Sequence, residues 1–338
     1  MFVLLLRKLL FPFSLLYGLV VHLRNWCYDK GIFHSNDFSV PIICIGNLSV
    51  GGTGKTPMVE FLLQHLFTDK KVAVLSRGYK RKSKGFVLAG ADTTVQELGD
   101  EPYQIFSKFK DQGVAVAVEA DRAMGIEHLM TKVGPKVILM DDAYQHRKVT
   151  PTFSILLTQY ARPYWDDWYL PTGNLRDSKG AAQRAQVIVV TKCPKDLSLQ
   201  QAEWIREKRT LGKGQKLLFA SLAYGPYFMS GKDQLSFEQA GKRKITLVTG
   251  IADPGPLVRH LTECGLSFEH LAYGDHHFFS KKELEELKKK ELVLTTEKDY
   301  VRLKEHVADL FYLPVRHVFL FQGDEVLRDS LQAAIPFL

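Results

Sequence analysis

The sequence predicts an α/β fold divided into two lobes, each with a sheet between layers of helices. Short apolar runs rich in β-branched residues alternate with segments of helical periodicity along most of the chain. The chain has 338 residues, which is more than one small core organises and suits two domains. We expect an apolar N-terminal segment over residues 1–26, a larger lobe over 27–222 and, after a hinge, a smaller α/β/α lobe over 223–338.

The composition agrees with a folded protein that has an anionic partner. With 46% hydrophobic and 24% charged residues, the chain can bury a large apolar area and is not of the disordered class. The four cysteines lie far apart, so neither a zinc ribbon nor a disulfide framework is indicated, and a reducing compartment is favoured. A net charge of +8 and a pI near 9.1 do not by themselves choose between nucleic acid, a phosphorylated substrate and an anionic membrane surface.

The N-terminus is apolar but too short to cross a membrane. Its longer apolar run extends from Leu9 to Val21, which as a helix spans roughly 20 Å, against about 30 Å for the hydrocarbon core. Neither a basic region nor a small-residue cleavage site marks a secretory signal. The run is either a helix packed on the core or an anchor in the membrane plane, and its many leucine and aromatic residues favour the anchor. The side chains then expected near lipid headgroups are Arg7, Lys8, His22 and Arg24.

A glycine-rich loop between an apolar strand and a helix predicts a phosphate site. The strand is expected over residues 42–45, and Lys55-Thr56 opens a helix with apolar periodicity. Glycines let successive backbone N–H groups point into one concavity, and a helix N-terminus adds a partial positive charge. Lys55 is expected to reach the terminal phosphates of a nucleotide, and Thr56 to ligate Mg²⁺. Ser49 replaces the first glycine of the strict pattern, so the loop is a Walker A variant; the alternative is an ordinary glycine-rich turn.

An arginine at the end of the next strand suits the same phosphates. A short buried strand over residues 71–75 precedes Arg77, and in a doubly wound sheet ligands bind at the carboxyl ends of the strands. The alternative is a solvated loop arginine. These features together predict that the first lobe is P-loop NTPase-like. The residues expected to bind the nucleotide are Ser49, Val50, Gly51, Gly52, Thr53, Gly54, Lys55, Thr56 and Arg77.

Two aspartates at the end of a later strand predict the Mg²⁺ ligands. Residues 136–140 form an apolar run that ends in Asp141-Asp142, which is the Walker B arrangement. The pair lies 85 residues beyond Thr56, with strand-helix units between, and its alternative is a plain polar strand end. With Thr56, both aspartates are the expected metal ligands, and the spacing does not decide which of the two binds directly.

Asp100 and Glu101 are candidates for proton transfer. They stand between Gly99 and Pro102 at the expected start of a helix, where acidic residues commonly cap the N-terminus. A kinase that acts on a sugar hydroxyl also needs a carboxylate or imidazole within hydrogen-bond reach of the attacking oxygen. Spacing alone leaves both interpretations open.

Three later loops carry polar side chains that could take part in a site. Residues 171–177 form a turn-rich loop that suits a phosphate or a sugar. Residues 191–194 resemble the guanine-reading element of GTPases, but Pro194 occupies the aspartate position and no D-x-x-G follows Asp142, which argues against a GTPase. In the second lobe, Asp275 and His276 lie in a loop before a charged helix expected over residues 281–292. Without further ligands at suitable spacing, a proton relay is favoured over zinc.

The order of these motifs resembles the tetraacyldisaccharide 4'-kinase family of lipid A biosynthesis, over almost the whole chain. The resemblance implies a membrane-associated P-loop kinase that moves the γ-phosphate of ATP to the 4'-hydroxyl of a tetraacylated, 1-phosphorylated glucosamine disaccharide, with Mg²⁺. The segments that carry it are G-G-T-G-K-T-P (51–57), S-R-G-Y (76–79), G-D-E-P (99–102), D-D-A-Y-Q-H (141–146), P-T-G-N-L-R (171–176), G-I-A-D-P (250–254), D-H-H-x-F (275–279) and T-E-K-D (296–299).

The resemblance also implies roles for individual residues. Asp100 matches the general base and His276 the histidine that pairs with it, while Lys55 acts on the phosphates. Ala143 stands where the family pattern has glycine, and Asp177-Ser178 where it has Glu-Pro, which puts local loop geometry in doubt more than the reaction. The residues expected to contact the substrate headgroup are Glu101, Asn174, Arg176 and Gln145.

The expected partners are the lipid A disaccharide precursor and the anionic inner-membrane surface, with no nucleic acid and no obligate protein partner. The expected location is the cytoplasmic face of the bacterial inner membrane, as a peripheral or monotopic protein. Two other classes share some of these features. A P-loop ATPase or switch protein would hydrolyse ATP without a lipid acceptor, and a basic membrane scaffold with a vestigial loop would not bind Mg²⁺-ATP.

Overall fold

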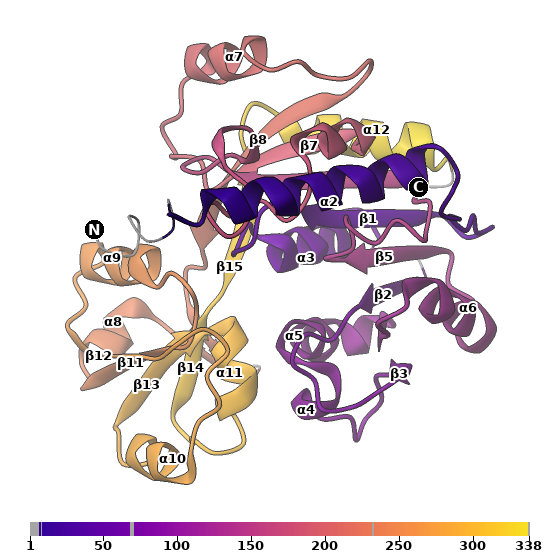
Figure 1. Cartoon of the computed structure of the whole chain (residues 1–338). Coiled ribbons are helices and arrows are strands. Elements are labelled where there is room, and N and C mark those ends of the chain that lie inside the picture. Colours follow the sequence, from indigo (N-terminus) through magenta and orange to yellow (C-terminus); the bar gives the residue numbers. More distant parts are fainter. Residues whose placement is uncertain (1–6, 8, 68–70, 232, 337–338) are drawn as a thin grey trace.

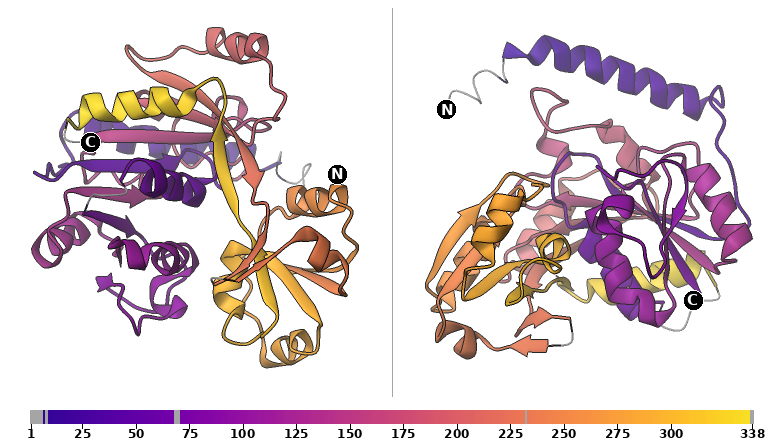
Figure 2. Two further views of the ribbon diagram at one scale, coloured as in Figure 1. Left: turned by 180° about the vertical axis from the view of Figure 1, so that it is seen from behind. Right: turned by 90° about the horizontal axis from the view of Figure 1, so that it is seen from below.

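A computed structural model describes residues 7, 9–67, 71–231 and 233–336, and it shows two lobes, each built on its own sheet (Figure 1). The chain crosses from the first lobe to the second after Tyr224 and returns before Val315. The two crossings lie against each other, because the Gly225 N–H donates to the Pro314 carbonyl at 2.8 Å. Figure 2 shows this pair of strands running between the lobes. The predicted α/β fold with a larger and a smaller lobe is confirmed.

The first lobe holds a nine-stranded sheet in the order β15-β8-β7-β6-β1-β5-β2-β4-β3. Its interior strands run parallel, and the edge strands β3 and β15 pair antiparallel with their neighbours. β1, β2, β5 and β7 are buried at every position, as expected for parallel strands covered on both faces. The strands are β1 (Ile42–Asn47), β2 (Val72–Ser76), β3 (Val87–Leu88), β4 (Ala115–Val118), β5 (Val137–Asp141), β6 (Phe153–Gln159), β7 (Val187–Thr191), β8 (Lys216–Tyr224) and β15 (Val315–Phe319).

Helices cover both faces of this sheet and enclose two hydrophobic cores. One core receives Leu62 of α3, Phe109 of α5 and Leu327 of α12, and the other receives Ile126 of α6 and Ala202 of α7. The helices are α3 (Lys55–His65), α4 (Val95–Leu98), α5 (Asp100–Phe109), α6 (Arg122–Lys132), α7 (Leu199–Glu207) and α12 (Gly323–Ala334), with short 3₁₀ turns at Lys110–Gln112, Tyr164–Asp166 and Lys179–Arg184.

The second lobe holds a six-stranded sheet in the order β10-β9-β14-β13-β11-β12. Its central strands β11, β13 and β14 are parallel, with α8 and α9 packed on one face and α10 and α11 on the other. The elements are β9 (Phe228–Ser230), β10 (Asp233–Leu235), α8 (Phe237–Gly241), β11 (Ile245–Thr249), α9 (Gly255–Glu263), β12 (Phe268–Ala272), α10 (Lys281–Leu287), β13 (Leu292–Thr296), α11 (Glu297–Leu303) and β14 (Leu310–Leu313).

The structure differs from the expected division at the C-terminal end. The last part of the 223–338 segment belongs to the first lobe, because β15 pairs with β8 and the apolar face of α12 packs on the first sheet. The helix expected over residues 281–292 ends at Leu287, so that β13 can begin at Leu292. The segment 296–299, expected as a turn after a strand, caps and begins helix α11.

The N-terminal helix α2 (Phe11–Asp29) turns its small and polar residues inward. Ser14, Gly18, Val21 and Asn25 are buried, while its large apolar side chains point away from the lobe. Ser14 Oγ donates to Thr172 Oγ1 at 2.8 Å, and a Cβ on Gly18 would meet the Tyr169 ring at 2.8 Å. No helix in the described part of the chain is long and apolar enough to cross a bilayer. The large apolar residues exposed on α2 and just before it are Leu9, Phe13, Leu15, Leu16, Leu19, Val20, Leu23 and Trp26.

Candidate functional site

The glycine-rich loop turns sharply from β1 into α3, and its geometry requires Gly54. Gly54 adopts φ +86°, which favours glycine, and a Cβ there would lie 2.8 Å from the His317 ring. His317 is buried in β15, and its Nε2 donates to the Gly54 carbonyl at 2.8 Å. No side chain of the described residues caps the N-terminus of α3, so its first N–H groups are available to an anion. Lys55 and Thr56 are the first two residues of that helix.

Neighbouring segments hold the rest of the loop in place. Asn47, which the sequence analysis did not single out, donates through Nδ2 to Thr53 Oγ1 at 2.9 Å. The Val50 N–H donates to the Asn174 carbonyl at 2.8 Å, and Gln159 Nε2 to the Gly52 carbonyl at 3.0 Å. The loop is therefore shaped by its own backbone and by β6 and the 171–176 segment.

Asp141 and Asp142 end β5 beside the loop, in different electrostatic settings. Asp142 lies 3.7 Å from Lys55 Nζ and pairs with Arg176. Burial works against ionisation, but the charges of Lys55 and Arg176 hold the pKa of Asp142 below its usual range. Asp141 is 4% exposed, and burial together with the charge of Asp142 raises its pKa to about 7. Its Oδ1 has no hydrogen-bond partner among the described residues.

Three of the four predicted substrate residues contact the nucleotide-loop region or Asp142, namely Arg176, Gln145 and Asn174, whereas Glu101 lies in a cluster where the two lobes meet. Arg176 contacts Asp142 and the Asn47 side chain, and Gln145 Nε2 donates to the Asn47 carbonyl at 2.7 Å. Asn174 accepts at Oδ1 from Arg7, the first described residue of the N-terminal segment, at 3.1 Å. The 171–176 loop thus connects the nucleotide loop to the N-terminal helix. Arg77 lies exposed at the end of β2.

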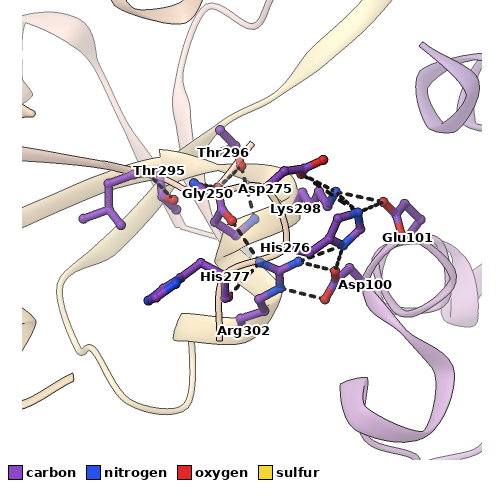
Figure 3. A network of polar contacts seen from close by, with 12 residues as sticks. Asp100, Glu101, Gly250, Asp275, His276, His277, Thr295, Thr296, Lys298 and Arg302 are labelled. Atoms are coloured by element: carbon purple, nitrogen blue, oxygen red, sulfur yellow. Dashed lines mark hydrogen bonds and ion pairs between the residues drawn. The ribbon is translucent and has the colours of Figure 1, made fainter. Parts of the chain in front are cut away.

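A second polar cluster lies where the lobes meet, at the N-terminus of α5 (Figure 3). His276 Nδ1 lies 2.8 Å from Asp100 Oδ2. Arg302 donates hydrogen bonds to both oxygens of the same carboxylate, with Nε 2.7 Å from Oδ1. Burial opposes ionisation of Asp100, but hydrogen bonds from Arg302 and His276 and the charge of Lys298 hold its pKa well below the usual range. Asp100 is therefore an ionised, fully paired carboxylate.

Lys298 occupies the other side of the His276 ring. Its Nζ lies 2.9 Å from His276 Nε2, 3.0 Å from Glu101 Oε1 and 3.2 Å from Asp275 Oδ1. Because an ammonium only donates, the 2.9 Å contact makes Nε2 the acceptor nitrogen and leaves Nδ1 to donate to Asp100. Arg302 Nη2 lies farther from Nδ1, at 3.3 Å, and donates to the same carboxylate. Asp100, Glu101 and His276 converge closely enough to hold a metal ion, but Lys298 and Arg302 already supply positive charge there.

The motifs of the second lobe meet in this cluster. The Gly250 carbonyl accepts from the His276 N–H at 3.1 Å, and the Gly250 N–H donates to Asp299 at 2.8 Å. Asp299 also accepts from the Thr296 hydroxyl at 2.7 Å, which fixes the start of α11. His276 itself adopts φ +60°, a left-handed conformation that this loop imposes on it. Sequence reasoning missed Arg302, which stands outside the motifs, and gave no role to Lys298 within T-E-K-D.

The two clusters belong to one site. Helix α5, which begins at Asp100, contacts helix α3, which begins at Lys55, because Gln104 Nε2 donates to Glu60 Oε1 at 2.8 Å. Burial and the charge of Asp142 raise the pKa of Asp141, and the charge of Glu101 adds to them. A phosphate loop beside the buried Asp141 and the partly exposed Asp142, together with an Asp-His pair at the lobe contact, is the arrangement expected of a P-loop kinase.

Comparison with known proteins gives the family. The model of the family described as tetraacyldisaccharide-1-P 4'-kinase matches residues 6–336, and the chain belongs to this family. It is 48% identical over 322 residues to the tetraacyldisaccharide 4'-kinase of Flavobacterium johnsoniae, covering 94% of each chain. The enzyme of the same name from Phocaeicola vulgatus is 42% identical, with 96% of this chain and 94% of the relative covered.

A solved structure shares the fold over the same extent. The crystal structure of LpxK from Aquifex aeolicus, described as an "apo" form in complex with ATP, superposes with a TM-score of 0.79. It is 30% identical, and the match covers 97% of this chain and 99% of that one. The family resemblance stated from the motifs is thereby confirmed.

Proposed function

We propose that this protein transfers the γ-phosphate of ATP to the 4'-hydroxyl of a tetraacyldisaccharide 1-phosphate at the cytoplasmic face of the inner membrane. The observation that carries the proposal is the 2.8 Å contact between Asp100 and His276, which joins the lobe that carries the nucleotide loop to the second lobe. In the reaction a bond forms between the 4'-oxygen and the γ-phosphorus, the bond from that phosphorus to the bridging oxygen of ADP breaks, and the hydroxyl proton passes to the Asp-His pair.

The residues of the first lobe position the phosphates. Lys55 reaches the terminal phosphates from the first turn of α3, and the uncapped N–H groups of that helix donate hydrogen bonds to the phosphate oxygens. Arg176 now pairs with Asp142 and would exchange this contact for a substrate oxygen. Arg77 is exposed and free to turn toward the same charge. Phosphoryl transfer depends mainly on such positioning and charge neutralisation.

The carboxylates at the end of β5 fit Mg²⁺. Asp141 is buried with an unpartnered Oδ1 beside a second carboxylate, and a divalent cation would satisfy both. Thr56 would complete the ligand set from the protein. Bound Mg²⁺ supplies charge that neutralises the nucleotide phosphates during transfer.

Asp100 and His276 remove the proton from the acceptor hydroxyl. Asp100 is held ionised, so it can accept a proton, and it orients the imidazole through Nδ1. Glu101, Asn174 and Gln145 contact the substrate headgroup from the first lobe. The second lobe therefore contributes the imidazole, while the first contributes the carboxylate and the phosphate loop.

The N-terminal helix attaches the protein to the membrane surface. Its apolar residues point outward while its polar residues bind the 171–178 loop, which is the reverse of a helix packed on a core. The same loop carries Asn174 and Arg176, so a headgroup at the membrane lies next to the residues proposed to bind it. We expect Leu16→Ser/Leu19→Ser/Leu23→Ser to lower binding to anionic vesicles at least about tenfold, because about 0.8 kcal/mol is lost for each CH₂ no longer buried. Vesicle sedimentation measures this, and unchanged binding would rule out the anchor.

The transfer itself is tested with γ-labelled ATP, Mg²⁺ and the detergent-solubilised tetraacyldisaccharide 1-phosphate. The proposal expects label in the lipid and little release of phosphate without the lipid. Label released as inorganic phosphate at the same rate with and without lipid would instead indicate an ATPase or switch protein. A lipid acceptor lacking the 4'-hydroxyl is the matched control, since it should take up no label.

A further inference from the structure

A second charged cluster joins the lobes away from the Asp-His pair. Lys108 Nζ lies 2.5 Å from Glu60 Oε2 and 2.9 Å from Glu297 Oε1. Gln104 Nε2 donates to the other oxygen of Glu60 at 2.8 Å. Both carboxylates are buried, with Glu60 4% and Glu297 7% exposed. One lysine therefore holds two buried acids, one from each lobe.

The cluster and the Asp-His pair lie at opposite ends of the same helix pair. Asp100 at the start of α5 pairs with Arg302 near the end of α11, and Lys108 near the end of α5 pairs with Glu297 at the start of α11. The two helices thus run antiparallel. At one end α5 supplies the acidic residue and α11 the basic one, and at the other end α5 supplies the basic residue and α11 the acidic one. Residues 100, 104 and 108 are spaced four apart, which places them on one face of α5. Asp100 and Lys108 of this face contact the second lobe, and Gln104 between them contacts Glu60 of the first.

The cluster also reaches the nucleotide loop. Glu60 lies in α3, one and a half turns after Lys55. Lys108 lies in α5, the helix that begins at Asp100, and it contacts both α3 and α11. Helix α3 begins at Lys55, and α11 carries Lys298 and Arg302, which flank His276.

We propose that Lys108, held between Glu60 and Glu297, is a positioning residue that couples the nucleotide helix to the lobe contact in which Asp100 meets His276. This proposal rests on the proposed function. It assigns a role to Glu297, the glutamate of the T-E-K-D segment. When the lobes part, Lys108 keeps Glu60 but loses Glu297, so the ion pair with Glu297 forms only in the closed arrangement.

The ion pair between Lys108 and Glu297 is suited to lobes that open and close. Glu297 Oε2 has no partner among the described residues, and burial and the charge of Glu60 raise the pKa of Glu297 to about 7 against the effect of Lys108. The closed arrangement therefore carries a desolvation cost at Glu297 that the lysine only partly offsets. Such a contact specifies one alignment of the lobes without locking them, which permits product release.

The test combines kinetics with amide hydrogen exchange on the full chain. Lys108→Met is expected to lower kcat about tenfold or more, with KM for Mg²⁺-ATP changed less than about threefold, because binding groups remain while alignment is lost. Exchange should become faster in residues 100–109 and 297–303. Glu297→Gln keeps an oxygen acceptor for Lys108 and should cost less than about threefold in kcat. Lys288→Met, which removes an exposed pair with Glu285, is the control and should change neither measurement.

A double-mutant cycle separates positioning from general damage. If Lys108 acts by placing Asp100 against His276, Lys108→Met should lower kcat less than about threefold when Asp100 is already Asn. Losses that multiply independently would overturn the proposal, as would full activity and unchanged exchange in Lys108→Met.

A folding failure of Lys108→Met and a failure of the proposed function can both be told apart from a wrong proposal. If Lys108→Met does not fold, the variant Lys108→Met/Glu60→Gln/Glu297→Gln leaves no unpaired buried charge and should fold with the same loss of kcat; full kcat in it refutes the role. If the unmodified protein labels no lipid, the proposed function fails, while the exchange measurement still decides whether Lys108 holds the lobes together.

Discussion

The nucleotide loop and the cluster at the lobe contact reach their geometry in opposite ways. The loop is one short segment shaped by glycine conformations and by neighbours in the same sheet. The lobe cluster joins Asp100 to His276 and Arg302, which are 176 and 202 residues away. The first site therefore persists in any arrangement of the lobes, whereas the second exists only when they meet.

The two sites also differ in how their buried carboxylates are paired. In the first site Asp141 is buried, lacks a partner at Oδ1, and has a pKa raised to about 7 by burial and Asp142. In the second site both oxygens of Asp100 are paired and its pKa is lowered, although burial opposes this. In the first site Lys55 and Arg176 pair with Asp142 but leave Asp141 Oδ1 without a partner among the described residues, and a divalent cation can supply one. In the second site the charges are already balanced, so any ligand that binds there has to replace existing contacts of Asp100, Lys298 or Arg302.

The largest effect is expected at the nucleotide loop. Lys55→Ala removes the ammonium that faces Asp142 and the phosphate site, and should lower kcat by about 10³-fold with weaker ATP binding. Steady-state transfer assays and equilibrium ATP binding measure the two losses. Lys132→Ala, at an exposed lysine in α6, is the control. If Lys55→Ala impairs lipid binding instead of ATP binding, the division of roles between the two sites is wrong.

An intermediate effect is expected at the lobe contact. Asp100→Asn keeps the size of the side chain but removes the charge that accepts a proton, and should lower kcat about 10²-fold while ATP binding changes little. Asp121→Asn is the matched control, because Asp121 also stands at a helix N-terminus and Asn caps equally well. Near-normal turnover in Asp100→Asn would exclude Asp100 as the base.

The same contrast explains what the sequence could predict. The loop, the strand before it and the Asp141-Asp142 strand end are local patterns, and the structure places them where the periodicity indicates. The return of β15 and α12 to the first sheet depends on pairing between residues about ninety positions apart, for which no local pattern exists. Arg302 was missed for the same reason, since an arginine on a short helix acquires its role only from the Asp100 opposite it.

The smallest effect is expected from Arg302 and is best seen in the pH profile. Arg302 holds Asp100 through both oxygens, as Arg243 holds Asp309 on the surface of the second lobe. Arg302→Met removes a charge and hydrogen bonds that favour the ionised carboxylate, so the pKa of Asp100 should rise toward its ordinary value or above it. If Asp100 is the base, as proposed, it must be ionised to act, and activity should then fail at a higher pH as the solution is acidified.

We expect Arg302→Met to lower kcat/KM about tenfold at neutral pH and to move the acid limb of its pH profile upward by about one pH unit or more. Arg243→Met breaks an ion pair of the same type away from the site and should leave the profile unchanged. An acid limb that stays in place would mean that His276, not Asp100, sets it. The proton acceptor would then be the imidazole Nε2 that Lys298 now contacts, and the carboxylate would only orient the ring.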